Sequence, residues 1–562
     1  MTEMEREIVF KTMVKVCPLC RSSLHTYKTE RRTVKSVNGS FVAVHKIMKC
    51  RNHETRFKSE LLHSIIEPYC TYANTVMIEG SMRRFIDGRS GEEIAVEMNN
   101  GISGRHVRRL SNTALDIFPV IHAENSHKIR SAIKSYILQI DGTTDSEFAM
   151  IVVVRDLISG FILLVKRCYS ESHQSIMEVL KSIREKFDAP SGITCDMRSG
   201  IISAVSEVFP GIPVRICLMH FLRDLGKDLL QSMHTDLGIM INRKRIKSSL
   251  KSILREMPDH DQKTLDEIGV GYASDRDKVE IMVIRHILEK LIGSTGSSGF
   301  GFPFSLKHMN FYIACMEAKN SLAVLSGKIV SEKGKEYIKF INETLAAIID
   351  NDAIRTTGKN LGSVNALFQS MRRAFKVPCK GKLSDELPDD DSIHNKCRLI
   401  IKHMNVFLRA DIPNHIRTAA RIIVDRYHKR EEMLFANNSE HTIPRTNNGM
   451  ERFFRKLRRN VRKRTGNTNT GNILTQSGDS LALFQNMGNP NYVKIVFDSR
   501  DIASEFAKYR KPFMKKDMTV QRKRELVKKG TEMLMNDSLS DTVYTPEVME
   551  KAKLYRGSSS TI

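Results

Sequence analysis

The chain has 562 residues, 41% of them hydrophobic, so we expect three or four folded domains. Lys plus Arg exceed Asp plus Glu by 25, which predicts a polyanionic partner, nucleic acid rather than a membrane surface. The charges of Arg155 and Asp156 interrupt the most apolar region, Phe148–Val165, which excludes a spanning helix there, and the N-terminus lacks the basic and then apolar layout of a secretion signal. Ten cysteines without regular spacing favour a reducing compartment.

Residues 1–65 are expected to form a zinc ribbon that binds DNA. Two Cys-x-x-ligand knuckles supply three thiolates and one imidazole, the soft donor set of closed structural zinc sites. The spacer between them contains Asn38-Gly39, a favoured hairpin turn, within an alternating segment. Either His25 or His45 could replace the imidazole ligand. The expected ligands are Cys17, Cys20, Cys50 and His53.

Residues 66–128 are expected to form a helix-turn-helix domain. Ser90 and Glu93 have capping-box spacing, and Ser103 can cap the next helix. An ordinary helical hairpin with a solvated basic face is the alternative. The shared core would consist of Ile94, Ala95, Met98, Ile102, Val107 and Leu110. The side chains offered to DNA would be Arg105, Arg108 and Arg109.

Residues 129–230 have the element order of an RNase H-like catalytic core. A helix at Gln174–Phe187 and another from Met197 lie between apolar runs. In that fold the ends of the first and fourth strands are neighbours, so Asp141 and Asp196 could share a pair of metal ions about 4 Å apart. The expected strands are Tyr136–Asp141, Phe148–Val154, Gly160–Cys168, Gly192–Asp196 and Val214–Cys217.

Residues 231–440 are mostly helical and polar in pattern, which predicts an all-helical insertion into the catalytic core. Gly381–Asp391 is expected to be a loop, and its acidic residues to be solvated. Before the insertion, Cys217 and His220 stand three residues apart at a strand-to-helix junction. They could clasp a metal ion, or pack and form hydrogen bonds.

Residues 441–470 are expected to return to the catalytic core as a helix that carries the third acid, Glu451, and residues 471–562 to form a basic tail. Met450, Phe454, Leu457 and Val461 recur at helical spacing and would bury one face. Glu451 could also be an ordinary N-terminal glutamate favoured by the helix dipole. The cationic side chains expected to steer DNA are Arg452, Arg455, Arg458, Arg459 and Arg462.

The order of these features resembles the DDE transposases of the Mutator-like type and their prokaryotic insertion-sequence relatives, over about residues 15–470. The resemblance implies that Asp141, Asp196 and Glu451 bind two Mg²⁺ or Mn²⁺ ions, next to one structural Zn²⁺ per chain. Cys217 and His220 match the family's Cys-x-x-His signature. The chain departs from hairpin-forming relatives, which stack a flipped base on Trp, because it has no Trp.

The resemblance implies a DNA transposase that cleaves element ends and joins the 3′-hydroxyl to target DNA. Its partners would be the terminal inverted repeats, the target DNA and further copies of the chain, as a homodimer or a higher oligomer on DNA. The protein would be located in the cytoplasm, on nucleoid DNA, or in the nucleus if the host is eukaryotic. The alternatives are an RNase H-like nuclease without strand transfer and a domesticated DNA-binding regulator.

Overall fold

The computed structural model describes residues 6–144, 150–168, 172–294, 300–377, 390–437, 442–510, 526–530 and 532. It is mixed α/β, as the sequence predicts, and most of its regular elements are helices. Within the described segments, no helix combines the length and the apolarity that a bilayer crossing requires. The chain divides into two compact units. Unit 1 comprises Met1–Ser191, Ser199–Gly211 and Asn448–Ile562, and unit 2 comprises Gly192–Arg198 and Ile212–Asn447.

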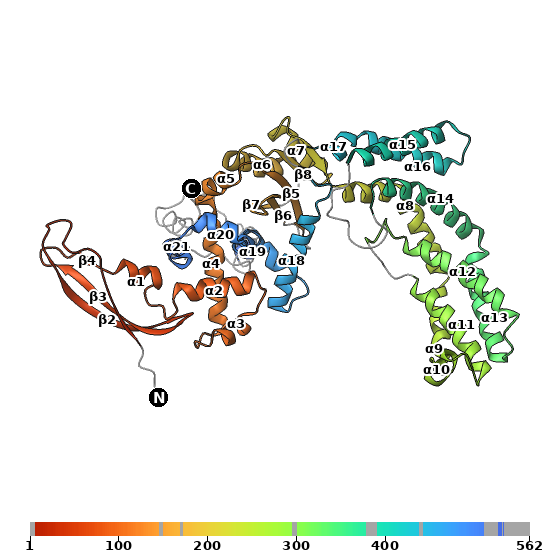
Figure 1. Cartoon of the computed structure of the whole chain (residues 1–562), viewed down its shortest axis with the longest axis horizontal. Helices are drawn as coiled ribbons and strands as arrows, with labels where there is room; N and C mark the ends of the chain where they lie inside the picture. Colours follow the sequence, from red (N-terminus) through yellow and green to blue (C-terminus); the bar gives the residue numbers. More distant parts are fainter. Residues whose placement is uncertain are drawn as a thin grey trace. The chain divides into compact units, whose positions relative to one another are not determined.

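A four-stranded sheet opens unit 1 (Figure 1). Its strands are β1 (Glu7–Lys11), β2 (Leu24–Ser36), β3 (Gly39–Cys50) and β4 (Arg56–Phe57). The antiparallel hairpin of β2 and β3 is the one that the sequence predicts, while β1 pairs with β3 in parallel. Ser36 pairs with Gly39, so the turn consists of Val37 and Asn38, one residue earlier than the expected Asn-Gly pair.

A helical segment follows this sheet within unit 1. Its helices are α1 (Glu60–Ile65), α2 (Asn74–Phe85), α3 (Gly91–Met98), α4 (Gly104–Glu124) and α5 (Ser126–Ala132). The predicted capping box at Ser90 and Glu93 is present, and Ser103 caps α4 by accepting a hydrogen bond from the His106 backbone N–H. The packed faces of α2, α3 and α4 bury four of the expected core residues: Ile94, Ile102, Val107 and Leu110.

The second sheet has the strand order β7-β6-β5-β8-β9. Its strands are β5 (Ile137–Thr144), β6 (Met150–Asp156), β7 (Ile162–Cys168), β8 (Gly192–Cys195) and β9 (Val214–Ile216). The first three form an antiparallel meander, and β8 pairs with β9 in parallel. These are the five runs expected to be strands. The centre of β6, Ile151–Val154, is buried on both faces, which explains its uninterrupted apolar run.

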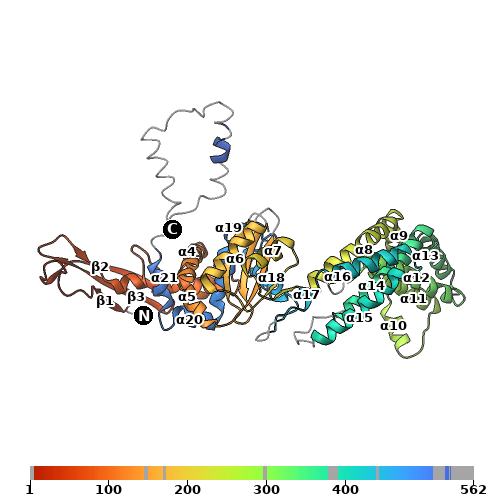
Figure 2. The ribbon, with the colours of Figure 1, turned by 90° about the horizontal axis from the view of Figure 1, so that it is seen from above.

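Helices from two distant parts of the sequence complete unit 1 (Figure 2). They are α6 (His173–Phe187), α7 (Ser199–Val208), α18 (Asn448–Thr465), α19 (Gly471–Phe484), the 3₁₀ helix η1 (Gln485–Gly488), α20 (Pro490–Phe497) and α21 (Ile502–Lys508). Residues 471–508, expected as the start of a tail, pack on the unit: α19 contacts β6 and β7, and α21 contacts α1 and α2. The buried Asn486 side chain bonds both the N–H and the carbonyl of Ile162, each at 2.8 Å.

Every regular element described between Leu218 and Phe435 in unit 2 is a helix, in agreement with the polar helical pattern. The long helices α8 and α14 pack along each other (Figure 1). The helices are α8 (Leu218–Arg243), α9 (Ile246–Glu256), α10 (Gln262–Gly269), α11 (Arg276–Gly293), α12 (Lys307–Ser326), α13 (Glu332–Ile349), α14 (Asp352–Ala374), α15 (Asp390–Arg409), α16 (Asn414–His428) and α17 (Glu431–Phe435).

Two buried charges anchor unit 2. Arg215 is 1% exposed and binds the Asp390 carboxylate through two nitrogens, at 2.8 and 3.0 Å. Asp390 therefore begins a helix and neutralises a buried cation, although the sequence suggested a solvated loop; the loop residues before it lie outside the described residues. Glu280, also buried, accepts hydrogen bonds from Ser331 and Val330. Each anchor satisfies a charge that burial would otherwise penalise.

Candidate functional sites

Four side chains of unit 1 converge beside the hairpin, and we call them the Cys-His cluster: Cys17, Cys20, Cys50 and His53. Their donor atoms all lie within 4.8 Å of one another. The Sγ atoms of Cys20 and Cys50 are 3.5 Å apart, and Nδ1 of His53 is 3.8 Å from Cys17 Sγ and 3.6 Å from Cys50 Sγ. Tetrahedral zinc with ordinary bond lengths separates its ligand atoms by about 3.5–3.8 Å. The cluster can therefore hold a structural metal ion such as zinc, with the predicted ligand set.

Hydrogen bonds from backbone N–H groups fix the turn of each knuckle. The Arg21 N–H donates to the Cys17 carbonyl at 2.8 Å, and the Asn52 N–H donates to Cys50 Sγ at 3.3 Å. Hydrogen bonding with Ser22 lowers the pKa of the Cys20 thiol to about 6, whereas burial raises the pKa of Cys50. The thiolate is the form that binds a metal ion, so Cys20 is already prepared for that role.

Neither alternative histidine belongs to the Cys-His cluster. His45 lies on β3 with its Nε2 accepting a hydrogen bond from the Ser59 N–H at 3.1 Å, and burial lowers its pKa. His25 lies on β2, opposite Lys49. Of the three candidates, His53 is the imidazole that the structure brings to the thiols.

Asp141 lies inside β5 in unit 1, not at its end as the sequence suggested. Pairing with β6 continues past it, through Gly142 opposite Val152, so the turn begins later. The Asp141 side chain is 8% exposed, and its Oδ1 accepts a hydrogen bond from the Gly142 N–H at 2.8 Å. Alternation along a strand places Gln139 on the same face as Asp141. This face of β5 therefore carries a buried carboxylate.

Glu451 lies in the first turn of α18, also in unit 1, and is partly exposed. The predicted apolar face of this helix is buried at Met450, Phe454, Leu457 and Val461. The start of α18 lies against β5, because a Cβ atom built on Gly449 would stand 3.4 Å from Gln139 Oε1. The helix that carries Glu451 thus begins over the face of β5 that carries Asp141.

Asp196 directly follows β8 in unit 2 and is 9% exposed. Its Oδ1 accepts a hydrogen bond from the Met197 N–H at 2.6 Å and lies 3.6 Å from Nδ1 of His220, in the first turn of α8. Its Oδ2 lies 3.6 Å from the Arg198 guanidinium. The histidine of the Cys-x-x-His pair therefore stands beside the second acid.

Cys217 faces a different partner from His220. Its Sγ accepts a hydrogen bond from the Asn447 N–H at 3.2 Å, and its own N–H donates to the Cys195 carbonyl at 2.9 Å. The thiol is buried and ties the residue just before α18 to the start of α8. The structure thus favours the packing and hydrogen-bonding role that the sequence left open against metal clasping.

Among the residues that the structure describes, the Cys-His cluster is the one group of three or more His, Cys, Asp or Glu side chains that lie close enough together to hold a metal ion. The three acids do not form such a group, and they belong to both units: Asp141 and Glu451 to unit 1, Asp196 to unit 2. Their use as one triad belongs to the functional proposal.

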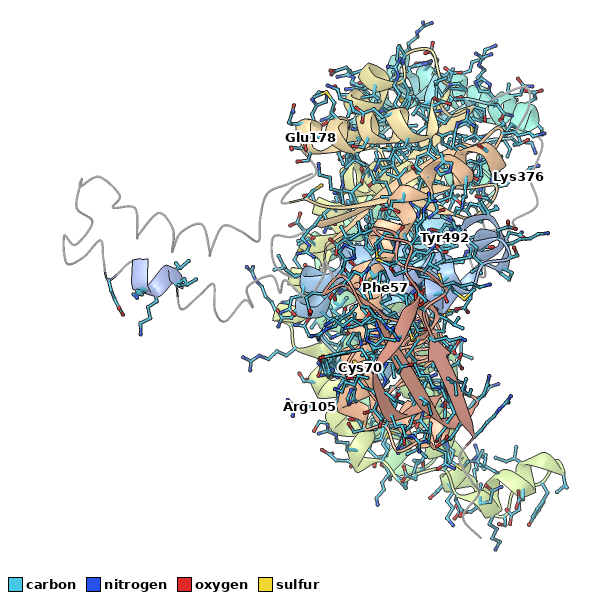
Figure 3. The ribbon with its side chains drawn as sticks, turned by 90° about the vertical axis from the view of Figure 1, so that its left-hand side faces the viewer. Phe57, Cys70, Arg105, Glu178, Lys376 and Tyr492 are labelled. Atoms are coloured by element: carbon cyan, nitrogen blue, oxygen red, sulfur yellow. The ribbon has the colours of Figure 1, made fainter. Side chains whose placement is uncertain are left out.

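The three predicted DNA readers on α4 differ in their surroundings. Arg105 and Arg109 are exposed, and Figure 3 labels Arg105. Arg108 is only half-exposed and forms an ion pair with Glu92, where it lowers the pKa of that carboxyl. Arg105 and Arg109 are therefore more accessible to solvent than Arg108.

The arginines of α18 divide between solvent and packing. Arg452, Arg455, Arg459 and Arg462 are exposed, and Arg458 is half-buried. Further along, Arg464 stacks on the Phe85 ring at 4.8 Å, and burial lowers its pKa to about 9. The Asn460 amide donates to the carbonyls that end α2. One face of α18 is thus exposed, while the opposite face contacts the end of α2.

Sequence reasoning did not single out Arg155 or Lys456, which line a hollow together with Arg452. Arg155 follows the apolar run of β6, and in the sequence it mattered only as a charge that excludes a membrane-spanning helix. Nothing in its local sequence distinguishes it, because the hollow is built from three segments far apart in the chain. Comparison of this sequence with protein-family models and with curated proteins finds no match.

Proposed function

We propose that the chain is a DNA transposase that cleaves the ends of a mobile element and joins the 3′-hydroxyl to target DNA. One observation carries the proposal: α18 begins over the face of β5 that bears the buried Asp141, and Glu451 stands in its first turn beside exposed arginines. Carboxylates beside a basic surface are what a metal-dependent reaction on a phosphodiester needs.

Asp196 is the second acid of the triad that the resemblance implies. The strand order β7-β6-β5-β8-β9, with an antiparallel meander and then parallel strands, supports an RNase H-like core. Three carboxylates are a hard oxygen donor set that fits Mg²⁺ or Mn²⁺. When bound, two such ions supply Lewis acidity at the attacking and leaving oxygens.

The remaining residues position the substrate in this proposal. Exposed arginines of α18 contact phosphates without reading sequence, and the helical segment with Arg105 and Arg109 reads the element ends. His220 stands beside Asp196, with its Nδ1 3.6 Å from Oδ1 of that carboxylate. The Cys-His cluster fixes the ribbon, which adds to binding of the ends.

The test is an assay of end-containing DNA with Mg²⁺ that separates cleaved from joined products. We expect joined products from the wild type and none from Asp141→Asn, Asp196→Asn or Glu451→Gln. Glu178→Gln is the control, since this exposed carboxylate on α6 pairs with Lys166 and is none of the three acids (Figure 3). Cleavage without joining would favour the nuclease, and binding without cleavage the DNA-binding regulator. Full activity of Asp141→Asn would end the transposase proposal.

A further inference from the structure

A basic pocket in unit 1 lies between the end of β6, the first turns of α18 and η1. Its volume is about 490 Å³, within the range of small-molecule sites. All of its lining residues belong to unit 1. Those used below are Arg155, Gly160, Gly449, Arg452, Phe453 and Lys456.

Three cationic side chains line the basic pocket: Arg155, Arg452 and Lys456. Its lining, as far as the structure describes it, contains no carboxylate. Two acids adjoin lining residues in the sequence, and neither belongs to the lining: Glu451 precedes Arg452, and Asp156 follows Arg155. Asp156 is fully buried and accepts hydrogen bonds from the N–H groups of the following turn. Burial lowers the pKa of Arg155; the charge of Asp156 works against this shift, and the charge of Arg452 adds to it. Three cationic groups gathered in one lining create a positive potential that an anion would relieve.

The arginine at the end of β6 is held in place by its surroundings. Arg155 Nε donates to the Gly160 carbonyl at 3.2 Å. A Cβ atom on Gly160 would stand 3.0 Å from Arg155 Nη2, and one on Gly449 would stand 3.5 Å from Nη1. The guanidinium therefore occupies space that a glycine leaves open on each side. This fixed placement suits a planar donor that binds two oxygens of one phosphate.

The other wall of the basic pocket is aromatic and polar. Phe453 is partly exposed there, with its ring 5.6 Å from the buried ring of Phe454. Gln485 also lines the pocket; its Nε2 donates to the Phe85 carbonyl at 3.0 Å. Its Oε1 is buried without a hydrogen-bond partner among the described residues. A flat ring could stack on the exposed part of Phe453.

We propose that the basic pocket binds one nucleotide of a DNA strand, with its phosphate on Arg155, Arg452 and Lys456 and its base against Phe453. The choice of DNA as the source of this nucleotide rests on the proposed function. The site itself requires only a phosphate joined to a flat ring. It is distinct from the carboxylates, because none of its lining residues is Asp141, Asp196 or Glu451.

The test is calorimetric titration of the full-length chain, without added divalent ions, with dAMP, deoxyadenosine and inorganic phosphate. We expect dAMP to bind at least about tenfold more tightly than either fragment, because it engages both walls of the pocket. Phe453→Ala and Lys456→Glu should each weaken dAMP binding about tenfold or more. Neither needs repacking of the core, since Lys456 is exposed and Phe453 partly so.

The matched control is Lys494→Glu, an exposed lysine on α20 outside the pocket, which should bind dAMP like the wild type. Equal affinity for dAMP and inorganic phosphate would overturn the nucleotide assignment, as would wild-type binding by both pocket variants. A short single-stranded DNA should displace dAMP, and failure to do so would overturn the placement of a strand there. A chain that binds dAMP but cleaves no DNA would retain this pocket and lose the transposase proposal.

Discussion

The Cys-His cluster and the carboxylates are assembled by different means. Each knuckle of the cluster spans four residues, and one antiparallel hairpin brings the two knuckles together. The acids are separated by 55 and 255 residues, from 141 to 196 and from 196 to 451, and they belong to both units. A site closed by neighbouring turns depends on one local element, whereas a site drawn from distant segments depends on the whole fold.

A second difference concerns what burial does to an acid. Asp141 and Asp196 are nearly buried, and each accepts a hydrogen bond from the backbone N–H of the next residue. Glu280 is buried as well, yet it accepts bonds from Val330 and Ser331 and pairs with Arg276. The bonds to Glu280 come from a loop 50 residues away and from a cation on its own helix, so this acid joins parts of the fold, whereas the bonds to Asp141 and Asp196 come from the adjoining residue.

The largest expected effect is on catalysis. Asp141→Asn should reduce cleavage and joining of end-containing DNA by about a thousandfold or more, because a metal ligand loses its charge. The same variant should keep the wild-type melting temperature within a few degrees, since Asn retains the hydrogen bond to Gly142. Parallel activity assays and calorimetric melting would check this. Loss of both activity and stability would mean that Asp141 is a structural acid like Glu280.

Loss of the Cys-His cluster should unfold one module and spare the rest. Zinc-ribbon metal sites contribute on the order of 10 kcal/mol to folding, so Cys50→Ser should release the metal ion and disorder the β2–β3 hairpin. Metal analysis should find about one zinc per wild-type chain and none in the variant. Cys168→Ser, at a buried thiol outside the cluster, is the control. Wild-type protein without zinc would contradict the metal assignment.

Glu280→Gln should cost about 2–3 kcal/mol in the unfolding free energy at neutral pH, because charged hydrogen bonds are lost. Burial alone would raise the pKa of Glu280, but hydrogen bonds from Ser331, Arg276 and Val330 lower it to about 2. The folded pKa lies below the unfolded one, so this stability is present above about pH 4.5 and is lost as pH falls toward 2. Denaturant unfolding at pH 7 and pH 3 should show that the difference in unfolding free energy between the wild type and the variant is smaller at pH 3. A constant difference would refute this prediction.

The smallest expected effect separates reading of DNA from general attraction. Arg105→Ala should reduce discrimination between element ends and random DNA by about tenfold, whereas Arg459→Ala should weaken binding to both and reduce the salt dependence. Arg108→Ala should have less effect than Arg105→Ala, since Arg108 already pairs with Glu92. Competition binding at two salt concentrations would measure this. Equal losses on both DNAs after Arg105→Ala would remove the reader role from α4.

The sequence predicted what depends on local periodicity. The capping box at Ser90, the five strands, the buried face of α18 and the Cys-His ligands all follow from spacing over a few residues. It misplaced the end of β5, because pairing with β6 carries the strand past Asp141 to Thr144. An apolar run cannot show where a strand partner stops.

Contacts between segments that are far apart in the chain could not be predicted from the sequence. The Asp390 carboxylate looked solvated because its partner, Arg215, is 175 residues away. Residues after 470 looked like a tail because their partners, such as Ile162 for Asn486, lie on β7. The basic pocket was missed for the same reason, since Arg155 and Lys456 meet only in the folded unit.

The interleaving of the two units also orders events during synthesis. The helices α18 to α21 that complete unit 1 are made after Ile212–Asn447, a stretch of 236 residues (447 − 212 + 1). At about 5–20 residues per second, a ribosome needs on the order of 10–50 seconds to translate that stretch. Until then the nascent chain lacks the helix that covers β6 and β7 and the amide that pairs with Ile162. The helices of unit 2 are available to fold during this interval, whereas β6 and β7 gain their covering helix only after it.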